Sequence, residues 1–137
     1  LGPGERRGVQ QVILDVRGRE VLFINTHIDF RNNPAERELD ADTLQQMVAG
    51  AGSRPVIMVG DFNAVPSSPF ITKIKTFIAD AWEIAGQGNG FTIPVKEPKR
   101  RIDYIFVSRA TVQPLRLEVI RSIASDHLPL LAEVQLK

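Results

Sequence analysis

Four short polar motifs, each at an end of an apolar run, limit what this chain can fold into more than any other feature of its sequence. The motifs are Asn25-Thr26-His27-Ile28-Asp29, Gly60-Asp61-Phe62-Asn63, Arg101-Ile102-Asp103-Tyr104-Ile105-Phe106 and Ser125-Asp126-His127-Leu128-Pro129. Short apolar runs bounded by turn residues are typical of β-strands. Both histidines of the chain lie in these motifs. The sequence therefore predicts a sheet whose strand ends gather carboxylates, imidazoles and amides around one cleft.

The first part of the sequence predicts a hairpin followed by a helix. Residues 9–16 and 21–24 are rich in β-forming residues and flank a turn that contains Gly18. Residues 21–24 are apolar on both faces, so we expect this strand to lie inside a sheet. Asn33 suits an N-cap and Pro34 suits the first helical position, which predicts a helix that ends near Gly50.

The second part predicts further strands around a second helix. Residues 56–59 form a continuous apolar run, the pattern of a buried central strand. The apolar spacing over residues 70–78 predicts a helix that closes at residues 80–82, and the glycines of residues 86–90 predict a loop. Strands are also expected over residues 102–107, 115–120 and 130–136. Helices that alternate with strands, followed by a strand-rich end, indicate an α/β layered arrangement.

Length and charge narrow the class of protein. A length of 137 residues predicts one domain. With 17 Lys and Arg against 16 Asp and Glu, the net charge of +1 argues against a protein that coats duplex DNA. The absence of cysteine excludes disulfides and thiolate metal sites. No stretch reaches the roughly 20 apolar residues of a membrane span. None of these features fixes the cellular compartment.

One basic concentration precedes the third motif, the run Lys96-Glu97-Pro98-Lys99-Arg100-Arg101. One interpretation is a solvated loop. The other is a lip that attracts phosphate, which is favoured by the position of the run directly before Asp103.

Three aspartates from separate motifs, Asp61, Asp103 and Asp126, predict a cation site assembled by the fold. A hard divalent cation such as Mg²⁺ takes oxygen ligands and often uses only one or two protein carboxylates beside a substrate phosphate. Asp126 and His127 would face opposite ways in an extended strand, whereas a local turn would bring both into the cleft. His127 is the acid–base candidate, and Asp103 is the carboxylate expected to orient it. A purely structural Asp103–His127 hydrogen bond is the alternative.

The other polar residues have more specific interpretations. Asp61 is expected to orient or deprotonate an attacking water, and Asn63 to hydrogen-bond a phosphate oxygen without adding negative charge. The alternative for both is an Asx turn after a strand. His27 is expected to donate to a phosphoryl oxygen or to the leaving group, and the alternative is a polar residue that merely ends a strand. Asn25 and Asp29 are interpreted as structural or loop residues. The aromatic residues expected to pack in the interior are Trp82, Tyr104 and Phe106, and the alternative for Trp82 is a place in the wall of the cleft.

In this order, the motifs resemble the C-terminal half of the endonuclease/exonuclease/phosphatase (deoxyribonuclease I-like) superfamily, over about residues 9–136. The resemblance implies catalytic roles for His27, Asp61, Asn63, Asp103 and His127, and metal-ligand roles for Asp126 and Asp61. It implies Mg²⁺ as the cofactor, with Mn²⁺ as a substitute. His27 matches the histidine that stabilises the transition state in the deoxyribonuclease-like branch, and the abasic-endonuclease branch typically has a different residue there.

The resemblance also implies a missing portion. The family fold is a four-layer α/β sandwich, with two sheets packed face to face and helices outside. The chain matches its C-terminal half, so residues 1–137 are expected to form a single partial domain without the N-terminal half. That half normally supplies a Glu metal ligand, and Glu5 and Glu20 lie in the wrong context to replace it. An uncovered sheet exposes apolar surface, so we expect either a homodimer through this face or a chain whose other half was removed.

Taken together, residues and resemblance predict a metal-dependent phosphoester hydrolase, similar to phosphodiesterases and nucleases. Its substrate would be nucleic acid, a phospholipid head group or a small phosphoester. The alternative is a catalytically incomplete fragment or an interaction module that keeps the fold. A sequence-specific DNA-binding module finds little support, because the sequence has no helix-turn-helix signature and no broad basic stripe.

Overall fold

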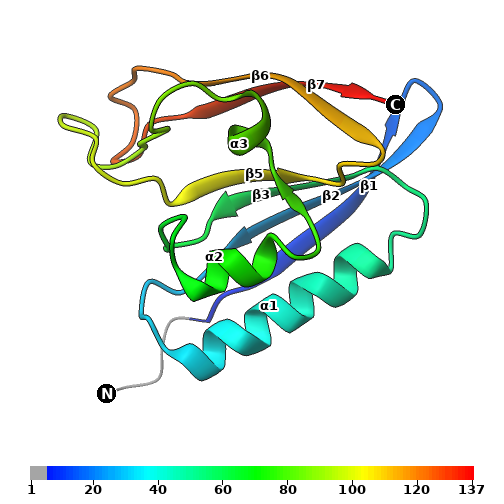
Figure 1. Cartoon of the computed structure of the whole chain (residues 1–137), viewed down its shortest axis with the longest axis horizontal. Helices are drawn as coiled ribbons and strands as arrows, with labels where there is room; N and C mark the ends of the chain where they lie inside the picture. Colours follow the sequence, from blue (N-terminus) through cyan, green and yellow to red (C-terminus); the bar gives the residue numbers. More distant parts are fainter. Residues whose placement is uncertain (1–5) are drawn as a thin grey trace.

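The predicted hairpin is present, and it forms one edge of a five-stranded sheet (Figure 1). In this computed structural model, which describes residues 6–137, β1 (Val9–Val16) pairs antiparallel with β2 (Arg19–His27). The turn between them places Arg17 and Gly18 at φ values of 55° and 81°. Positive φ at both central residues is the geometry that matches the twist of a two-residue hairpin.

The central sheet has the strand order β1-β2-β3-β5-β4. β3 (Val56–Asp61) lies parallel to β2 and antiparallel to β5 (Asp103–Val107), and β4 (Ala79–Asp80) is a short edge strand. The predictions of an internal strand at residues 21–24 and a central strand at residues 56–59 are therefore confirmed. Because β2 and β3 are parallel, their carboxyl ends meet at the same edge, where β5 begins.

Helix α1 (Pro34–Ala49) connects β2 to β3 and begins as predicted. The Asn33 side chain accepts hydrogen bonds from the amides of Ala35 and Glu36, and Pro34 occupies the first turn. The capping oxygen satisfies amides that have no partner within the helix.

The prediction of one helix from residue 70 to residues 80–82 is wrong. Helix α2 (Pro69–Ile74) is short, the chain then forms β4, and a separate helix α3 (Ala81–Ala85) follows. Asp80 explains the break, because its carboxylate accepts a hydrogen bond from the Trp82 amide at 2.9 Å and so caps a new helix. The same carboxylate pairs with buried Arg101 at 2.7 Å.

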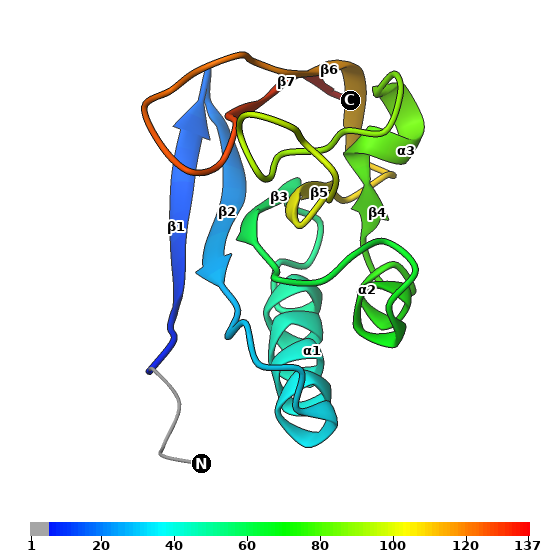
Figure 2. The same ribbon diagram turned by 90° about the vertical axis from the view of Figure 1, so that its left-hand side faces the viewer.

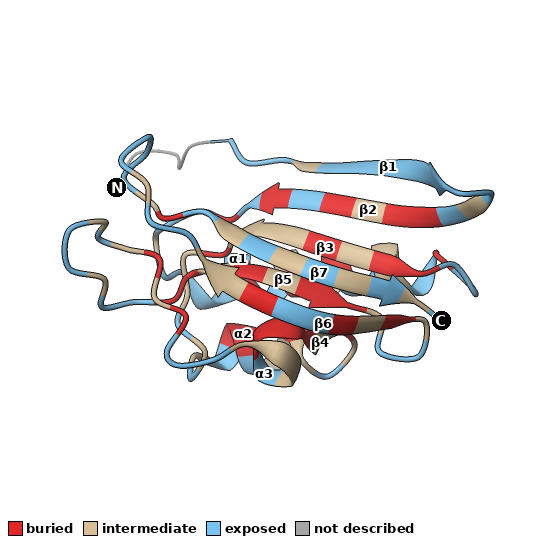
Figure 3. Ribbon diagram, turned by 90° about the horizontal axis from the view of Figure 1, so that it is seen from above, coloured by how far each residue is buried: buried red, intermediate tan, exposed pale blue. Residues whose placement is uncertain are grey.

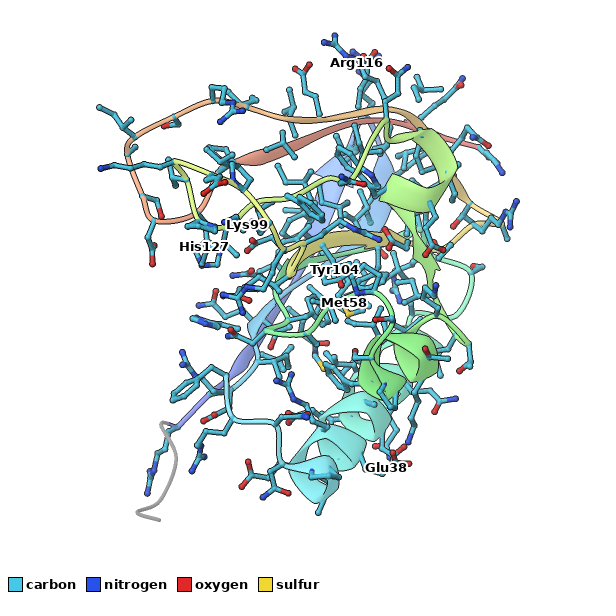
Figure 4. All side chains as sticks on the ribbon, turned by 60° about the vertical axis from the view of Figure 1, so that its left-hand side comes forward. Glu38, Met58, Lys99, Tyr104, Arg116 and His127 are labelled. Carbon is cyan, nitrogen blue, oxygen red and sulfur yellow. The ribbon has the colours of Figure 1, made fainter. Side chains whose placement is uncertain are left out.

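The main core lies between the sheet and helices α1 and α2 (Figures 2 and 4). Met58 and Tyr104 project into this layer from β3 and β5. The Phe62 ring packs edge-on against both Tyr104 and Phe106, with ring centroids 5.6 and 5.1 Å apart. The prediction that Trp82, Tyr104 and Phe106 are interior residues is confirmed.

A second sheet covers part of the opposite face. It consists of β6 (Val112–Val119) and β7 (Leu130–Leu136), which pair antiparallel. Its inner residues form a second apolar cluster with Val107, and the fold is thus the mixed, layered α/β arrangement that was predicted. Among the described residues, no helix is long and apolar enough to span a membrane.

The hairpin face beside this second sheet is open. Figure 3 shows β6 and β7 over β3 and β5, with β1 and β2 uncovered in that view. Val12, Leu14 and Val16 of β1 are exposed. The expected apolar surface is therefore present.

Candidate active site

Three of the predicted site residues form one row across the central sheet. His27 at the end of β2 is in register with Asp61 at the end of β3, and Asp61 is in register with Asp103 at the start of β5. Residues that face each other across neighbouring strands lie on the same side of a sheet. Figure 1 shows the ends of β2 and β3 and the start of β5, which carry this row, at the left of the sheet.

The fourth motif adds His127 from the loop before β7 (Figure 4). His127 Nδ1 lies 2.8 Å from Asp103 Oδ2, so the predicted pair is formed. Burial alone would lower the pKa of His127, but the hydrogen bond and charge of Asp103 outweigh it and hold the pKa above its ordinary value. The ring therefore has its Nδ1 side fixed, while Nε2 lies 3.9 Å from Asp61.

Thr92 supports this pair and was missed by the sequence analysis. Its fully buried hydroxyl donates to the same Asp103 oxygen that faces His127. Its carbonyl accepts a hydrogen bond from the Leu128 amide at 2.8 Å, which fastens the His127 loop to this segment. No local pattern in the sequence marks Thr92, because its role depends on contacts across the fold.

Asp61 lies between the two imidazoles. Its Oδ1 accepts a hydrogen bond from the Asn63 amide at 2.8 Å, which is the Asx turn considered above, and its Oδ2 lies 3.4 Å from His27 Nε2. Burial raises the pKa of Asp61, and the nearby Asp103 charge adds to this effect. The turn and the site are therefore formed by the same residues.

Gly60 is required for this geometry. It adopts φ 151°, and a Cβ there would lie 1.9 Å from the carbonyl oxygen of Thr26. Only glycine lets β3 approach β2 so closely at the point where His27 and Asp61 align.

His27 is held by Arg7, a second residue that the sequence analysis missed. An Arg7 guanidinium nitrogen lies 3.1 Å from His27 Nδ1. Arginine can only donate, so this contact places a donor at Nδ1. On the cavity side, His27 Nε2 lies 3.4 Å from Asp61 Oδ2 and 3.3 Å from Asn63 Nδ2.

A third missed residue, Arg37, holds two loops of the site together. From α1, its buried guanidinium donates to the carbonyls of Phe62 at 2.7 Å, Asp29 at 2.8 Å and Asn63 at 3.1 Å. It also lies over the Phe70 ring. Arg37 therefore fixes the backbone on both sides of the row.

The side chains of the row and of the fourth motif line one cavity of about 450 Å³. It is lined by Arg7, His27, Phe30, Asp61, Asn63, Asp103, Asp126 and His127. All predicted site residues lie there, and Asp126 and His127 both reach it because their loop turns. Asn25 and Asp29 do not line it. A larger cavity, of about 670 Å³, lies between α3 and β6; Trp82 lines it, but none of the predicted site residues does.

The basic run 96–101 does not line the cavity of about 450 Å³. Arg101 is buried in its ion pair with Asp80, and Lys99 pairs with Glu97 at 3.0 Å. The structure thus favours the interpretation of a solvated loop, and Arg7 is the cationic residue that lines the cavity.

The donor set suits a divalent cation. Asp61, Asp103 and His127 each offer an atom that lies within 4.8 Å of the others. Asp103 Oδ2 and His127 Nδ1 hydrogen-bond to each other, and Asp61 Oδ2 lies between His27 Nε2 and His127 Nε2, at 3.4 and 3.9 Å. Carboxylate oxygens in a polar cavity are what hard cations bind.

Comparison with known proteins places this geometry in context. The endonuclease/exonuclease/phosphatase family model matches residues 2–127. A solved endonuclease/exonuclease/phosphatase structure from Bacteroides vulgatus is 26% identical, with a TM-score of 0.79, over 88% of this chain and 51% of that one. The chain thus spans about half the length of that protein. A search of curated proteins gave no significant match.

Two further solved structures share the fold at lower identity. A mannosyl-6-phosphatase from Bacteroides thetaiotaomicron is 21% identical, with a TM-score of 0.76, over 97% of this chain and 67% of that one. D. rerio TDP2 complexed with a single-strand DNA product is 19% identical, with a TM-score of 0.74, over 94% and 62%. With the family match over most of its length, the chain belongs to the endonuclease/exonuclease/phosphatase family.

Proposed function

We propose that this chain carries the acid–base and phosphate-binding residues of a divalent-cation-dependent phosphoester hydrolase. One observation carries the proposal: the Asp61 carboxylate lies between His27 and His127, and Asp103 holds His127 from behind. A carboxylate beside an oriented imidazole is a general acid–base arrangement. The family match supports phosphoester hydrolysis as the reaction class.

The residues divide the work of proton transfer. Asp61 orients the attacking water, and its raised pKa brings it closer to the neutral range in which a carboxylate is an effective base. His127, held by Asp103 and Thr92, moves a proton at Nε2. His27 donates from Nε2, and Asn63 donates from its amide, to phosphoryl oxygens that gain charge in the transition state.

The family resemblance implies Asp61 and Asp126 as ligands of the cation, with Mg²⁺ as the natural candidate and Mn²⁺ as a substitute. Asp126 lines the same cavity but lies outside the close group formed by Asp61, Asp103 and His127. A bound divalent cation would neutralise phosphate charge and polarise the phosphoryl group. Nucleic acid, a phospholipid head group and a small phosphoester all remain candidate substrates.

A catalytically incomplete fragment is the second candidate. No glutamate lines the catalytic cavity in the part of the chain that the structure describes, and the family resemblance leads us to expect one as a metal ligand. In that case the chain would bind phosphate and cation without turnover.

Hydrolysis assays separate the two candidates. Chromogenic phosphodiester, plasmid DNA and sphingomyelin would be incubated with Mg²⁺ or Mn²⁺, with EDTA as the control. The proposal expects cation-dependent turnover that His127→Ala abolishes and that Lys99→Ala, a change in the exposed basic loop, leaves intact. Turnover that persists in EDTA or in His127→Ala would contradict it, and absence of turnover with an intact fold would favour the incomplete fragment.

A homodimer through the open face of β1 and β2 stays a prediction. Light scattering over a concentration series would test it, and a monomer at all concentrations would contradict it. Val12→Lys, on the exposed face of β1, should weaken such a dimer.

A further inference from the structure

Phe30 is the only apolar side chain among the residues that line the catalytic cavity as the structure describes it. The other lining residues are charged, amide or imidazole groups suited to a phosphate and a cation. Phe30 nevertheless exposes 65% of its surface to solvent. Single exposed apolar residues are common on protein surfaces, but this one lines a cavity whose other lining residues are polar.

The loop that carries Phe30 is firmly held. On one side, Ile28 is buried and its amide donates to the Asp61 carbonyl at 2.9 Å. On the other, the Asp29 carboxylate accepts from the Arg31 amide at 2.8 Å and from Arg31 Nε at 2.9 Å.

A third contact fixes the same loop from behind. Arg37 donates to the Asp29 carbonyl at 2.8 Å. The backbone before Phe30 is therefore held from two directions, while the ring itself stays exposed. A rigid segment that presents an apolar ring loses little entropy when a ligand covers it.

We propose that Phe30 is a specificity residue that stacks on a planar ring of the substrate, so that the site prefers phosphoesters of nucleoside type. The inference rests on the proposed function, because the phosphate must be bound by the neighbouring polar groups. Aromatic side chains stack on bases with little regard to base identity. Phe30 would thus select for a ring near the phosphate and not for a sequence.

Two ligands, one with and one without an aromatic base, test this inference. Adenosine 5′-monophosphate and ribose 5-phosphate share the phosphate and the sugar. Their dissociation constants would be measured by calorimetry with Mg²⁺, in a His127→Gln background that blocks turnover. We expect the adenosine ligand to bind about tenfold more tightly, which corresponds to ~1.4 kcal/mol. Phe30→Ala should remove this preference without weakening ribose 5-phosphate, and Phe30→Tyr should keep it.

The control is Val65→Ala, which changes an exposed apolar residue outside the cavity lining and should leave both constants unchanged. Equal binding of the two ligands, or a preference that survives in Phe30→Ala, would overturn the role of Phe30 and leave the proposed function standing. Tighter binding of hexyl phosphate than of the adenosine ligand, lost in Phe30→Ala, would also overturn it, in favour of an acyl-chain site. Absence of binding by every phosphate would overturn both proposals.

Discussion

Asp61 and Asp103 face each other directly across β3 and β5, so two carboxylates occupy one cross-strand pair. Like charges in such a pair destabilise a sheet. Burial adds to the cost for Asp61, whose pKa is raised. Stability alone would not favour this placement, whereas the cation and proton-transfer site that we propose needs both carboxylates.

The first prediction follows from this pair. Asp61→Asn should raise the free energy of unfolding by roughly 0.2–1 kcal/mol at pH 7 in EDTA, because it removes the repulsion and keeps an oxygen for the Asn63 amide. Since the pKa of Asp61 is raised on folding, the gain should shrink as the pH falls toward the ordinary carboxyl range. Urea titrations at several pH values measure the change in the free energy of unfolding, and Asp126→Asn, at an exposed position, is the control. A less stable Asp61→Asn protein at pH 7 would contradict the prediction.

His127 gives a pH dependence of opposite sign. Its pKa is raised in the folded protein, so the pairing with Asp103 stabilises the fold fully below about pH 6.5, and the contribution is lost as the pH rises through the folded pKa. His127→Gln should therefore cost more stability at pH 6 than at pH 9, in EDTA. NMR titration should also show a lower pKa for His127 in Asp103→Asn. An unchanged pKa in that variant would refute the orienting role of Asp103.

The site residues at strand ends could be predicted from the sequence, whereas the residues that hold them in place could not. Each polar motif adjoins a strand of strong local pattern, so the position of Asp61 and Asp103 at strand ends was predictable. Thr92 and Arg37 were not, because each acts through a carbonyl or carboxylate brought close only by the fold. The break between α2 and α3 was missed for the same reason, since Asp80 is fixed by Arg101, 21 residues away.

Thr92 should matter more for chemistry than for folding. Thr92→Val keeps the shape and removes the hydroxyl that donates to Asp103, so it should cost about 1 kcal/mol of stability. We expect a lower kcat and a changed pH profile, because Asp103 then holds His127 less firmly. Thr92→Ser, which keeps the hydroxyl, should restore both. A pH profile identical to that of the unaltered protein in Thr92→Val would argue against a positioning role.

Replacing Arg37 should lower the free energy of unfolding far more than replacing an exposed arginine. Arg37→Gln leaves buried carbonyls without donors, and each unsatisfied group costs about 1–3 kcal/mol. Arg54→Gln is the matched control, since Arg54 forms an exposed pair with Glu20 at 2.8 Å that is worth at most about 1 kcal/mol. Chemical denaturation compares the two variants, and equal losses would show that Arg37 does not fasten the loops.

Cation binding tests the central claim most directly, because it needs the assembled cavity and not turnover. The melting temperature would be followed as Mg²⁺ or Mn²⁺ is added to the unaltered chain and to Asp61→Asn. A ligand that binds only the folded state must raise the melting temperature. We predict a saturable rise in the unaltered chain and none in Asp61→Asn. A flat titration in the unaltered chain, or an equal rise in both, would contradict a cation site at Asp61.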